Sequence, residues 1–600
     1  MPRMKGGELI AEFLLREGID HVFGLCGHGN VGMLDALYDR RDRIRLISPR
    51  HEQVAAHMAD GYFRVRHRPA ATLTSCGPGS ANIVMALAVA QTDSSALLAI
   101  TANVPTSQFN RSPFQELNRH YQADFPSVLR PVVKRAFQPT RVDMLPLALR
   151  QAALTMLSGR PGPVNLDVPF NLFQEEDEVE VPAAWSATNP RRSGAAPEEV
   201  AQAAGMLLAA ERPVLFIGHG VTLSEAGAEL TALAERLRIP VISSPNGMGC
   251  LDMAHPLSLG FIGRNGAYPA NQAGRHADLV LAIGARFDDR SASSWIPGYS
   301  WNFPAARLIH VDVDHAEIGR NYTPDLGILA DARTFLRQLL SEIEARHAPP
   351  GAGRLAAWHA EIAAWRKEWD DFTRPNFERH TSPMRPERVV ADLRRVLPED
   401  AILSLDSGVH HNWFMQFWTA RRPQTMLNTW GFSGMGFGPS SILGAKLAAP
   451  ERVCVSVCGD GGFTMVPHVL CTAVEYDIPV VWVVWNNFAW GAIRDIQYGL
   501  FGGREIGTGF YAGENRRPYN PDFAAWARAA GVEGVTVTRS EDFAGALEHA
   551  VKLGRPALLD VHVDAEVRPP ATGTWALPPI PHKEPVFGAP WVPGAGPAGA

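Results

Sequence analysis

A carboxylate and two amides follow two neighbouring apolar segments and could together hold a cation. Asp460 comes directly after the segment RVCVSVCG, and Asn486 and Asn487 follow the segment IPVVWVVW. A helical pattern separates the two segments, and the strands of a strand–helix–strand unit end at the same edge of a parallel sheet. We therefore expect Asp460 and Asn487 to lie side by side. Such sparse oxygen ligands suit Mg²⁺, which keeps waters and takes phosphate oxygens as its other ligands.

The glycines around Asp460 extend this prediction to a diphosphate. Gly459, Gly461 and Gly462 flank the carboxylate at the point where a helix begins. Glycine lets the backbone approach a ligand closely, and a helix N-terminus favours an anion. A Gly-Asp-Gly turn alone is common in plain strand–helix connections. The Asn-Asn pair at the end of the next strand favours a magnesium–diphosphate site over a plain turn.

The composition is that of an ordinary globular enzyme. The chain has 600 residues, of which 46% are hydrophobic and 20% charged, and its net charge is −6. This balance gives no electrostatic argument for nucleic acid as a partner, and no apolar run reaches the roughly 18 residues of a membrane span. The 6 cysteines do not form a disulfide pattern. We therefore expect a cytoplasmic protein without nucleic-acid or membrane partners.

Short apolar runs alternate with helical patterns and predict an α/β fold with three doubly wound parallel-sheet domains. The first block covers residues 1–180 and is followed by an acidic, proline-rich linker. The second block covers 197–345, and a charged helical connector leads to the third block at 386–570. The tail at 571–600 is rich in proline, glycine and alanine.

The motif around Asp460 and Asn487 resembles the cofactor motif of thiamine diphosphate enzymes, and residues 5–565 resemble the acetolactate synthase family. The resemblance implies an N-terminal pyrimidine-binding domain, a central domain and a C-terminal diphosphate-binding domain. It also implies that the carbonyl of Ala489 joins Asp460 and Asn487 as a magnesium ligand. Glu52, in SPRHEQVAAHMADGYF, would be the carboxylate that activates the aminopyrimidine ring of the cofactor. Glu52 could otherwise be a helix-start carboxylate favoured by the helix dipole.

Further segments carry the same resemblance and imply further site residues. Met435, in GFSGMGFGPSS, would bend the cofactor, and His411, in SGVHHNWF, would contact the diphosphate, with His410 left open. Gln115 and Lys134 would act in the active site. The central domain resembles the flavin-binding one, which makes FAD an optional third cofactor. That domain could instead keep the pattern for its own core. The implied flavin-site residues are Gly284, Arg286 and Asp312.

The sequence departs from acetolactate synthases in the substrate pocket. Ile496 stands where the family has a tryptophan, and Arg264 stands where it has a methionine. His28, in CGHGNV, replaces a glycine in the loop that faces the thiazolium ring. This loop resembles that of trihydroxycyclohexanedione hydrolase, and an imidazole there could act as a general acid or base. A turn histidine bonded to the backbone is the plain alternative.

We therefore predict a thiamine diphosphate- and Mg²⁺-dependent carboligase or lyase that acts on a 2-oxo acid or a related small-molecule carbonyl substrate. The departures predict that it does not make acetolactate. The alternatives are a hydrolase that opens a cyclic 1,2-diketone, a flavin-dependent oxidase of the same family and a non-catalytic cofactor-binding relative. The resemblance also implies a homodimer or homotetramer with active sites at the dimer interface.

Overall fold

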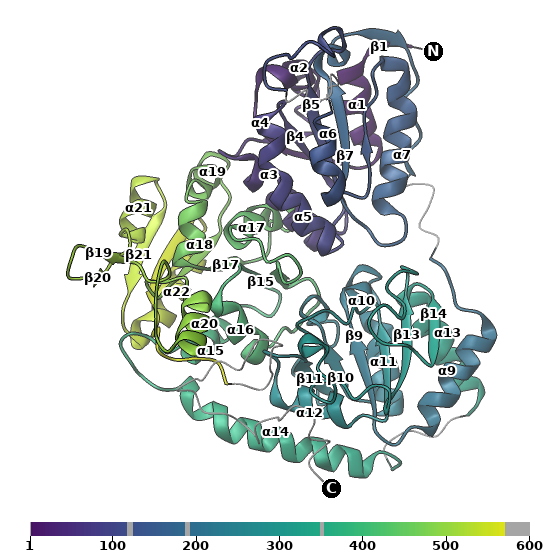
Figure 1. The fold of residues 1–600 in the computed structure, drawn as a ribbon, viewed down its shortest axis with the longest axis vertical. Helices are drawn as coiled ribbons and strands as arrows, with labels where there is room; N and C mark the ends of the chain where they lie inside the picture. The colour runs from purple at the N-terminus through teal and green to yellow at the C-terminus, as the bar shows by residue number, and fades with distance from the viewer. Residues whose placement is uncertain (1, 117–123, 186–191, 348–352, 571–600) are drawn as a thin grey trace.

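The computed structural model describes residues 2–116, 124–185, 192–347 and 353–570. These residues form three lobes, each built on a six-stranded sheet (Figure 1). The strands within each of the three sheets pair in parallel and are covered by helices, which confirms the predicted α/β fold. The predicted tail at 571–600 lies outside the described residues. No helix in the described ranges combines the length and apolar content needed to cross a bilayer.

The N-terminal lobe contains the sheet β3-β2-β4-β5-β7-β6. Its strands are almost entirely buried, as expected for a parallel sheet covered on both faces. The strands are β2 (His21–Gly24), β3 (Arg45–Ile47), β4 (Ala70–Thr74), β5 (Leu97–Asn103), β6 (Ala136–Phe137) and β7 (Val164–Pro169). The helices include α1 (Gly6–Arg16), α2 (Val31–Tyr38), α3 (Glu52–Arg66), α4 (Pro78–Asn82), α5 (Val84–Thr92) and α7 (Leu145–Leu157).

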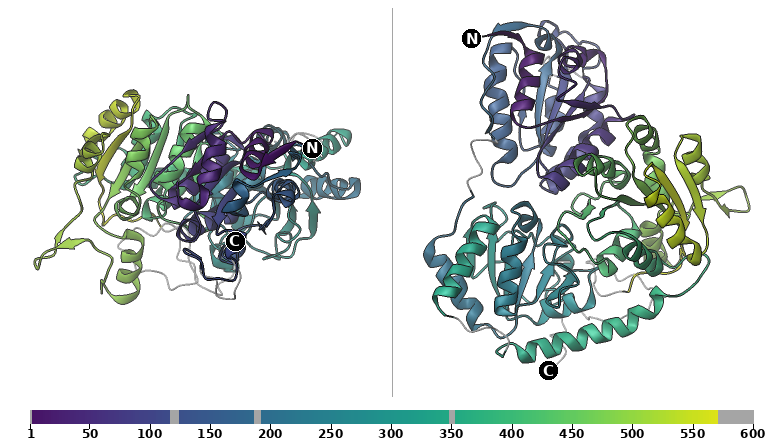
Figure 2. Two further views of the ribbon diagram at one scale, coloured as in Figure 1. Left: turned by 90° about the horizontal axis from the view of Figure 1, so that it is seen from above. Right: turned by 180° about the vertical axis from the view of Figure 1, so that it is seen from behind.

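The central lobe contains the sheet β11-β10-β9-β12-β13-β14. The strands are β9 (Pro213–Ile217), β10 (Val241–Ser243), β11 (Ser258–Phe261), β12 (Leu279–Ile283), β13 (Arg307–Asp312) and β14 (Leu326–Leu329). The helices are α9 (Pro197–Ala209), α10 (His219–Leu223), α11 (Gly227–Leu237), α12 (Tyr268–His276) and α13 (Ala332–Ala345). The predicted helical connector is α14 (Ala356–Phe377), which runs along the central and C-terminal lobes (Figure 2).

The C-terminal lobe contains the sheet β16-β15-β17-β18-β22-β21. The strands are β15 (Ile402–Leu405), β16 (Met426–Asn428), β17 (Cys454–Gly459), β18 (Val481–Asn486), β21 (Glu533–Val537) and β22 (Ala557–His562). The helices are α15 (Pro386–Val396), α16 (Val409–Phe417), α17 (Phe437–Ala448), α18 (Asp460–Met465), α19 (Val469–Glu475), α20 (Gly491–Phe501), α21 (Phe523–Ala529) and α22 (Ser540–Lys552). Cys454 and Cys458 are buried core thiols.

Helix α3 of the N-terminal lobe crosses α17 of the C-terminal lobe at very short range. A Cβ atom on Gly61 would collide with the backbone of Ser441, and one on Gly444 would collide with the backbone of Met58. Glycine is therefore required at both positions, because the two helix backbones leave no space for a side chain. The crossing fixes the direction of α3, whose first residue is Glu52.

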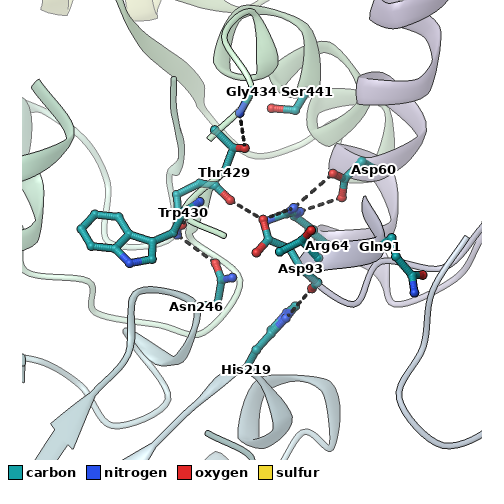
Figure 3. Close-up of polar contacts among 12 residues, drawn as sticks. Asp60, Arg64, Gln91, Asp93, His219, Asn246, Thr429, Trp430, Gly434 and Ser441 are labelled. Atoms are coloured by element: carbon teal, nitrogen blue, oxygen red, sulfur yellow. Dashed lines mark hydrogen bonds and ion pairs between the residues drawn. The ribbon is translucent and has the colours of Figure 1, made fainter. Parts of the chain in front are cut away.

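A buried ion-pair network joins all three lobes beside this crossing (Figure 3). Arg64 on α3 pairs with Asp60 at 2.7 Å and with Asp93 at 3.1 Å. It also donates to the carbonyl of Asn428 in the C-terminal lobe at 2.6 Å. The ring of His219, in the central lobe, lies 2.9 Å from the carbonyl of Asp93. Burial alone would lower the pKa of Arg64, but the two carboxylates raise it.

We predict that Arg64→Met destabilises the protein strongly. The substitution leaves Asp60 and Asp93 buried without their counterion, and breaking such a pair costs about 3–5 kcal/mol. The urea midpoint of the variant, measured by tryptophan fluorescence, should fall well below that of wild type. Arg150→Met, on the exposed face of α7, is the matched control and should leave the midpoint unchanged. An unchanged midpoint in Arg64→Met would contradict the role given to this network.

Candidate active site

The carboxyl ends of β17 and β18 form the centre of the site. The strands pair in parallel with Gly459 opposite Trp485, which sets Asp460 beside Asn486. Asp460 is the first residue of α18, and Asn487 begins the turn that leads to α20. The structure therefore brings together the carboxylate and the Asn-Asn pair, as their positions after neighbouring strands suggest.

Several donors hold the Asp460 carboxylate in place. It accepts hydrogen bonds from the backbone N–H of Gly461 at 2.9 Å and from the side-chain amide of Asn520 at 2.8 Å. The backbone N–H groups of Phe488 and Ala489 also donate to it. Burial raises the pKa of Asp460 to about 6. A cation beside this carboxylate would favour its ionised form.

Asn520 is a site residue that the sequence analysis missed. Its side-chain amide bridges Asp460 and the side-chain oxygen of Asn486, the latter at 2.7 Å. Asn520 lies in a connection between the short strand β20 (Arg517–Pro518) and α21, about 60 residues after Asp460. No strand end or glycine motif marks that position, so only the tertiary structure shows that it faces the site.

The backbone around Ala489 is fixed by hydrogen bonds on both sides. Trp490 N donates to Thr508 O, and Phe510 N donates to Phe488 O, each at 2.8 Å. Ala489 thereby forms an antiparallel bridge with Gly509. Ala489, whose carbonyl is the predicted metal ligand, thus lies beside Asp460 in a segment that backbone hydrogen bonds hold in place.

The glycines after Asp460 are required by close neighbours. A Cβ atom on Gly461 would collide with the ring of Trp490, and one on Gly462 would collide with the Asp406 carboxylate. Burial raises the pKa of Asp406 to about 6, although backbone N–H groups bond it. Asp406 follows β15 and is a second site residue that the analysis missed. A carboxylate directly after a buried strand was the available signal.

Met435 lies where the C-terminal and N-terminal lobes meet. The Asp406 carboxylate accepts from the N–H groups of Gly436 at 3.1 Å and Gly438 at 3.2 Å, which anchors the start of α17. The Met435 carbonyl accepts from the side chain of Gln53 at 3.2 Å. The residue next to Glu52 is therefore bonded directly to the segment that carries Met435.

The side chains of the two neighbouring histidines of α16, His410 and His411, contact different residues. His410 lies beside Gly408 and Gly459, next to the turn that holds Asp460. His411 packs edge-on against Trp430, with ring centroids 4.6 Å apart. Burial lowers the pKa of both rings. Nε2 of each ring is buried without a hydrogen-bond partner among the described residues. His410 is thus the histidine beside the Asp460 turn, and the diphosphate role of His411 stays a prediction.

Glu52 begins α3 and faces the loop after β4. His51 caps the helix by accepting from the N–H of Gln53 at 3.1 Å. Glu52 accepts a hydrogen bond from the side chain of Asn82 at 2.9 Å, and its other oxygen faces Gly79. The loop TSCGPGS, residues 74–80, therefore packs against this carboxylate.

Cys76, in the same loop, contacts the side chains of both His28 and Gln115. The His28 ring nitrogen Nε2 lies 3.5 Å from Cys76 Sγ, and the thiol donates to Gln115 Oε1 at 3.6 Å. Phe114 and Phe170 pack against the His28 ring at centroid distances of 5.7 and 6.0 Å. The structure thus joins two predicted residues through a cysteine that the sequence analysis missed.

Lys134, unlike His28 and Gln115, makes its hydrogen bonds next to the central lobe. Its ammonium donates to the carbonyls of Ser158 and Arg160, each at 2.8 Å. It lines a cavity that also contains Asp314 of the central lobe. Burial and the nearby charge of Arg160 together lower the pKa of Lys134 to about 8. These contacts place Lys134 at the junction with the central lobe, and its catalytic role stays a prediction.

A large cavity lies between the three lobes and brings the predicted flavin residues together. It has a volume of about 420 Å³ and is lined by Gly284, Arg286 and Asp312 at the carboxyl ends of β12 and β13. Gly284 adopts a φ of +53° and packs against the backbone of Gly220, so a side chain on either residue would collide. Burial raises the pKa of Asp312 to about 6.

Three family matches cover most of the chain. Residues 4–123 match the family described as "Thiamine pyrophosphate enzyme, N-terminal TPP binding domain". Residues 200–339 match the central domain of thiamine pyrophosphate enzymes, and residues 406–561 match their C-terminal TPP binding domain. The three matches follow the three lobes in order. The fold and the site therefore define a thiamine pyrophosphate enzyme.

Curated relatives narrow this class. The chain is 34% identical over 578 residues to a "Probable acetolactate synthase large subunit" of Methanocaldococcus jannaschii, which covers 94% of this chain and 93% of the relative. It is 33% identical to the large subunit of acetolactate synthase isozyme 1 of Escherichia coli, with coverage of 94% and 95%. The chain belongs to the thiamine pyrophosphate enzyme family and is a thiamine-dependent enzyme of the acetolactate synthase type.

The described residues fit the cofactor of this family. Nε2 of His410 is buried beside the Asp460 turn and has no hydrogen-bond partner among the described residues, so it is available to a ligand. Within the described ranges, no three or more His, Cys, Asp or Glu side chains group at metal-binding spacing. A cation at Asp460 would therefore depend on amide, carbonyl and phosphate oxygens, which is the ligand chemistry of Mg²⁺.

We predict that Gly462→Ala weakens thiamine diphosphate binding at least about tenfold, because the added methyl displaces Asp406 or the turn itself. Isothermal titration with thiamine diphosphate and Mg²⁺ measures the change. Gly545→Ala is the control, because an added Cβ atom there meets no atom within 4 Å. Equal affinity in both variants would show that the turn does not contact the cofactor.

Proposed function

We propose that this enzyme uses thiamine diphosphate and Mg²⁺ to cleave or form a C–C bond in a 2-oxo acid or a related carbonyl compound other than the substrates of acetolactate synthesis. The observation that carries the proposal is the contact between Asp460 and the Asn486–Ala489 turn. Ionised Asp460, the Asn487 amide oxygen and the Ala489 carbonyl would hold the cation. His410, with His411 as predicted, would contact the diphosphate.

The bound cofactor would supply an electron sink for breaking or forming the C–C bond. Glu52 would hold a proton against the aminopyrimidine ring, and its bond from Asn82 keeps the carboxylate in position. Met435 would support the bent cofactor beside α3. His28 and Gln115 would orient the substrate carbonyl and transfer protons. Lys134 is proposed for the same task on the family likeness alone.

The acceptor pocket supports a substrate different from that of acetolactate synthases. Arg264 is buried and pairs with Asp289 at 2.8 Å. The guanidinium of Arg290 lies near it and stacks on Trp430, 4.2 Å from the ring centroid. Ile496 offers a smaller wall on α20 than a tryptophan would. An arginine paired with Asp289 in place of a methionine, and a smaller apolar wall at Ile496, favour a substrate of different shape.

Ring opening of a cyclic 1,2-diketone is the second candidate. The observation that favours it is the His28 side chain, which the phenylalanine rings and Cys76 hold in the loop predicted to face the thiazolium ring. An imidazole there could activate water for hydrolysis. Comparing turnover of cyclic 1,2-diketones with turnover of 2-oxo acids separates this candidate from carboligation.

We also propose a homodimer or homotetramer in which a second subunit covers the site, and a cytoplasmic location. Large apolar side chains are exposed on elements next to the site: Phe114 is 76% exposed, Val31 53% and Ile493 52%. Such side chains at functional loops favour a protein interface. All 6 cysteines are free thiols, which suits a reducing compartment.

FAD is proposed for the cavity between the lobes. Gly284 and Gly220 let two strand-end loops approach each other, and Asp312 accepts a backbone N–H from Asp314 at 2.8 Å. A buried carboxylate after a parallel strand could accept from a ribose hydroxyl. Arg286 supplies a nearby cation.

Glu52→Gln tests the thiamine mechanism directly. We expect exchange of the cofactor C2 hydrogen to slow at least about 100-fold, because glutamine cannot hold the required proton. NMR of the quenched cofactor measures the rate, and titration checks that the cofactor still binds. Glu344→Gln, at an exposed position of α13, is the control. Turnover is then screened with 2-oxo acids, aldehydes and cyclic 1,2-diketones, with and without thiamine diphosphate and Mg²⁺. Undiminished exchange in Glu52→Gln would refute the mechanism.

Arg286→Met tests the flavin site. Removal of this cation should weaken FAD binding by at least about tenfold, since charge-assisted contacts to phosphate are strong. Absorbance of the protein after dialysis against FAD measures bound flavin, and Arg150→Met is the control. A wild-type protein that retains no flavin would contradict the proposal.

A further inference from the structure

We propose that Cys76 is a positioning residue that fixes the tautomer of His28 and the amide orientation of Gln115. The inference deepens the proposed function and rests on it, since it concerns the proton-transferring group of that site. Cys76 Sγ contacts both side chains, at 3.5 Å for His28 Nε2 and at 3.6 Å for Gln115 Oε1. It is the atom through which the two predicted site residues are connected.

The chemistry of the three groups determines the direction of both bonds. Gln115 Oε1 can only accept a hydrogen bond, so the thiol must donate its single proton to it. The sulfur then has no proton left for His28 and must act as the acceptor. His28 therefore carries its proton on Nε2, and the lone pair of the neutral ring lies on Nδ1. The Nδ1 atom is then the one that takes up a proton in the first half of a proton transfer.

Burial keeps this arrangement available at neutral pH. Cys76 is only 1% exposed, and burial raises the pKa of its thiol above the usual value, with Glu116 and Asp167 adding to the rise. The sulfur therefore retains its proton and does not become a thiolate. A thiolate would have no proton to donate to Gln115 Oε1 and would therefore no longer fix the orientation of that amide.

The surrounding backbone leaves the three groups little freedom. Gly29 approaches the sulfur so closely that an added Cβ atom would lie 3.1 Å from it, and an added Cβ atom on Gly77 would collide with the Gln115 carbonyl. Gln115 itself adopts a φ of +63°. Phe114 and Phe170 contact the His28 ring. These two rings flank the exposed His28 side chain, and the thiol decides which of its nitrogens bears the proton.

The test compares Cys76→Ala, Cys76→Ser and a matched control, Cys471→Ala, which removes an exposed thiol on α19. We expect Cys76→Ala to lower kcat about tenfold with KM nearly unchanged, because the histidine loses its fixed tautomer but keeps its place. Cys76→Ser should restore most of kcat, because a hydroxyl can donate and accept in the same way.

Two measurements need no substrate. The infrared S–H stretching band of wild-type protein, minus that of Cys76→Ala, should show a hydrogen-bonded thiol. Nitrogen-15 NMR of labelled His28 should show protonated Nε2 in wild type and a mixture of tautomers in Cys76→Ala. The melting temperature of Cys76→Ser should stay near the wild-type value, because a hydroxyl can keep both bonds. Thiamine C2 exchange should stay at the wild-type rate in both variants, because the Glu52 carboxylate bonds Asn82 and not this cysteine.

The outcomes separate this inference from the proposed function. If wild-type protein shows no thiamine-dependent turnover, the proposed function fails, whereas the spectra still report on the thiol. If wild type is active but Cys76→Ala keeps its full kcat and its His28 tautomer, the positioning role is overturned. A fall in kcat that Cys76→Ser does not restore, together with a lowered melting temperature, shows a packing role and also overturns it.

Discussion

Parallel pairing of β17 with β18 is the constraint on which the site depends. The pairing places Gly459 opposite Trp485 and leaves Asp460 next to Asn486 at one sheet edge. The neighbouring turn can then donate its backbone N–H groups to the carboxylate, and Asn520 can bridge the two side chains. The other two sheets use the same principle: Glu52 and Cys76 follow β3 and β4, and Gly284 and Asp312 stand at the ends of β12 and β13. The candidate site residues of all three sheets thus follow the carboxyl ends of parallel strands, where open α/β sheets bind ligands.

The lobes are joined by contacts that tolerate little change. Backbone-to-backbone packing of α3 on α17 requires Gly61 and Gly444, and Arg64 places a charge between Asp60 and Asp93 where the three lobes meet. Because α3 begins at Glu52, these contacts determine where that carboxylate lies relative to Met435. Asp93 also lines the cavity between the lobes. Helix α3 therefore positions Glu52 at its start and, through Arg64, also holds Asp93 in the wall of the cavity.

The residues predicted to contact the substrate lie apart from those predicted to hold the cofactor. The loop 74–80 packs against Glu52, and its cysteine, Cys76, contacts both His28 and Gln115. On the central lobe, Arg290 stacks on Trp430, and Arg264 pairs with Asp289. The predicted cofactor residues and the predicted substrate residues stand on different elements, so the second group can change without disturbing the first.

The sequence by itself determined the fold class, the three sheets and the strand-end positions of Asp460 and Asn487, because apolar strands and glycine turns are local patterns. It also indicated the family, through motifs that extend over most of the chain. Only the tertiary structure decided that Asn520, Asp406 and Cys76 belong to the site, that His410 is the histidine beside Gly459, and that Lys134 bonds to the carbonyls of Ser158 and Arg160. Its place directly after a buried strand marked Asp406 as a candidate, but its contacts, like the other placements, depend on which loops the folded sheets bring together. No local pattern of residue types encodes contacts between positions so far apart in the chain.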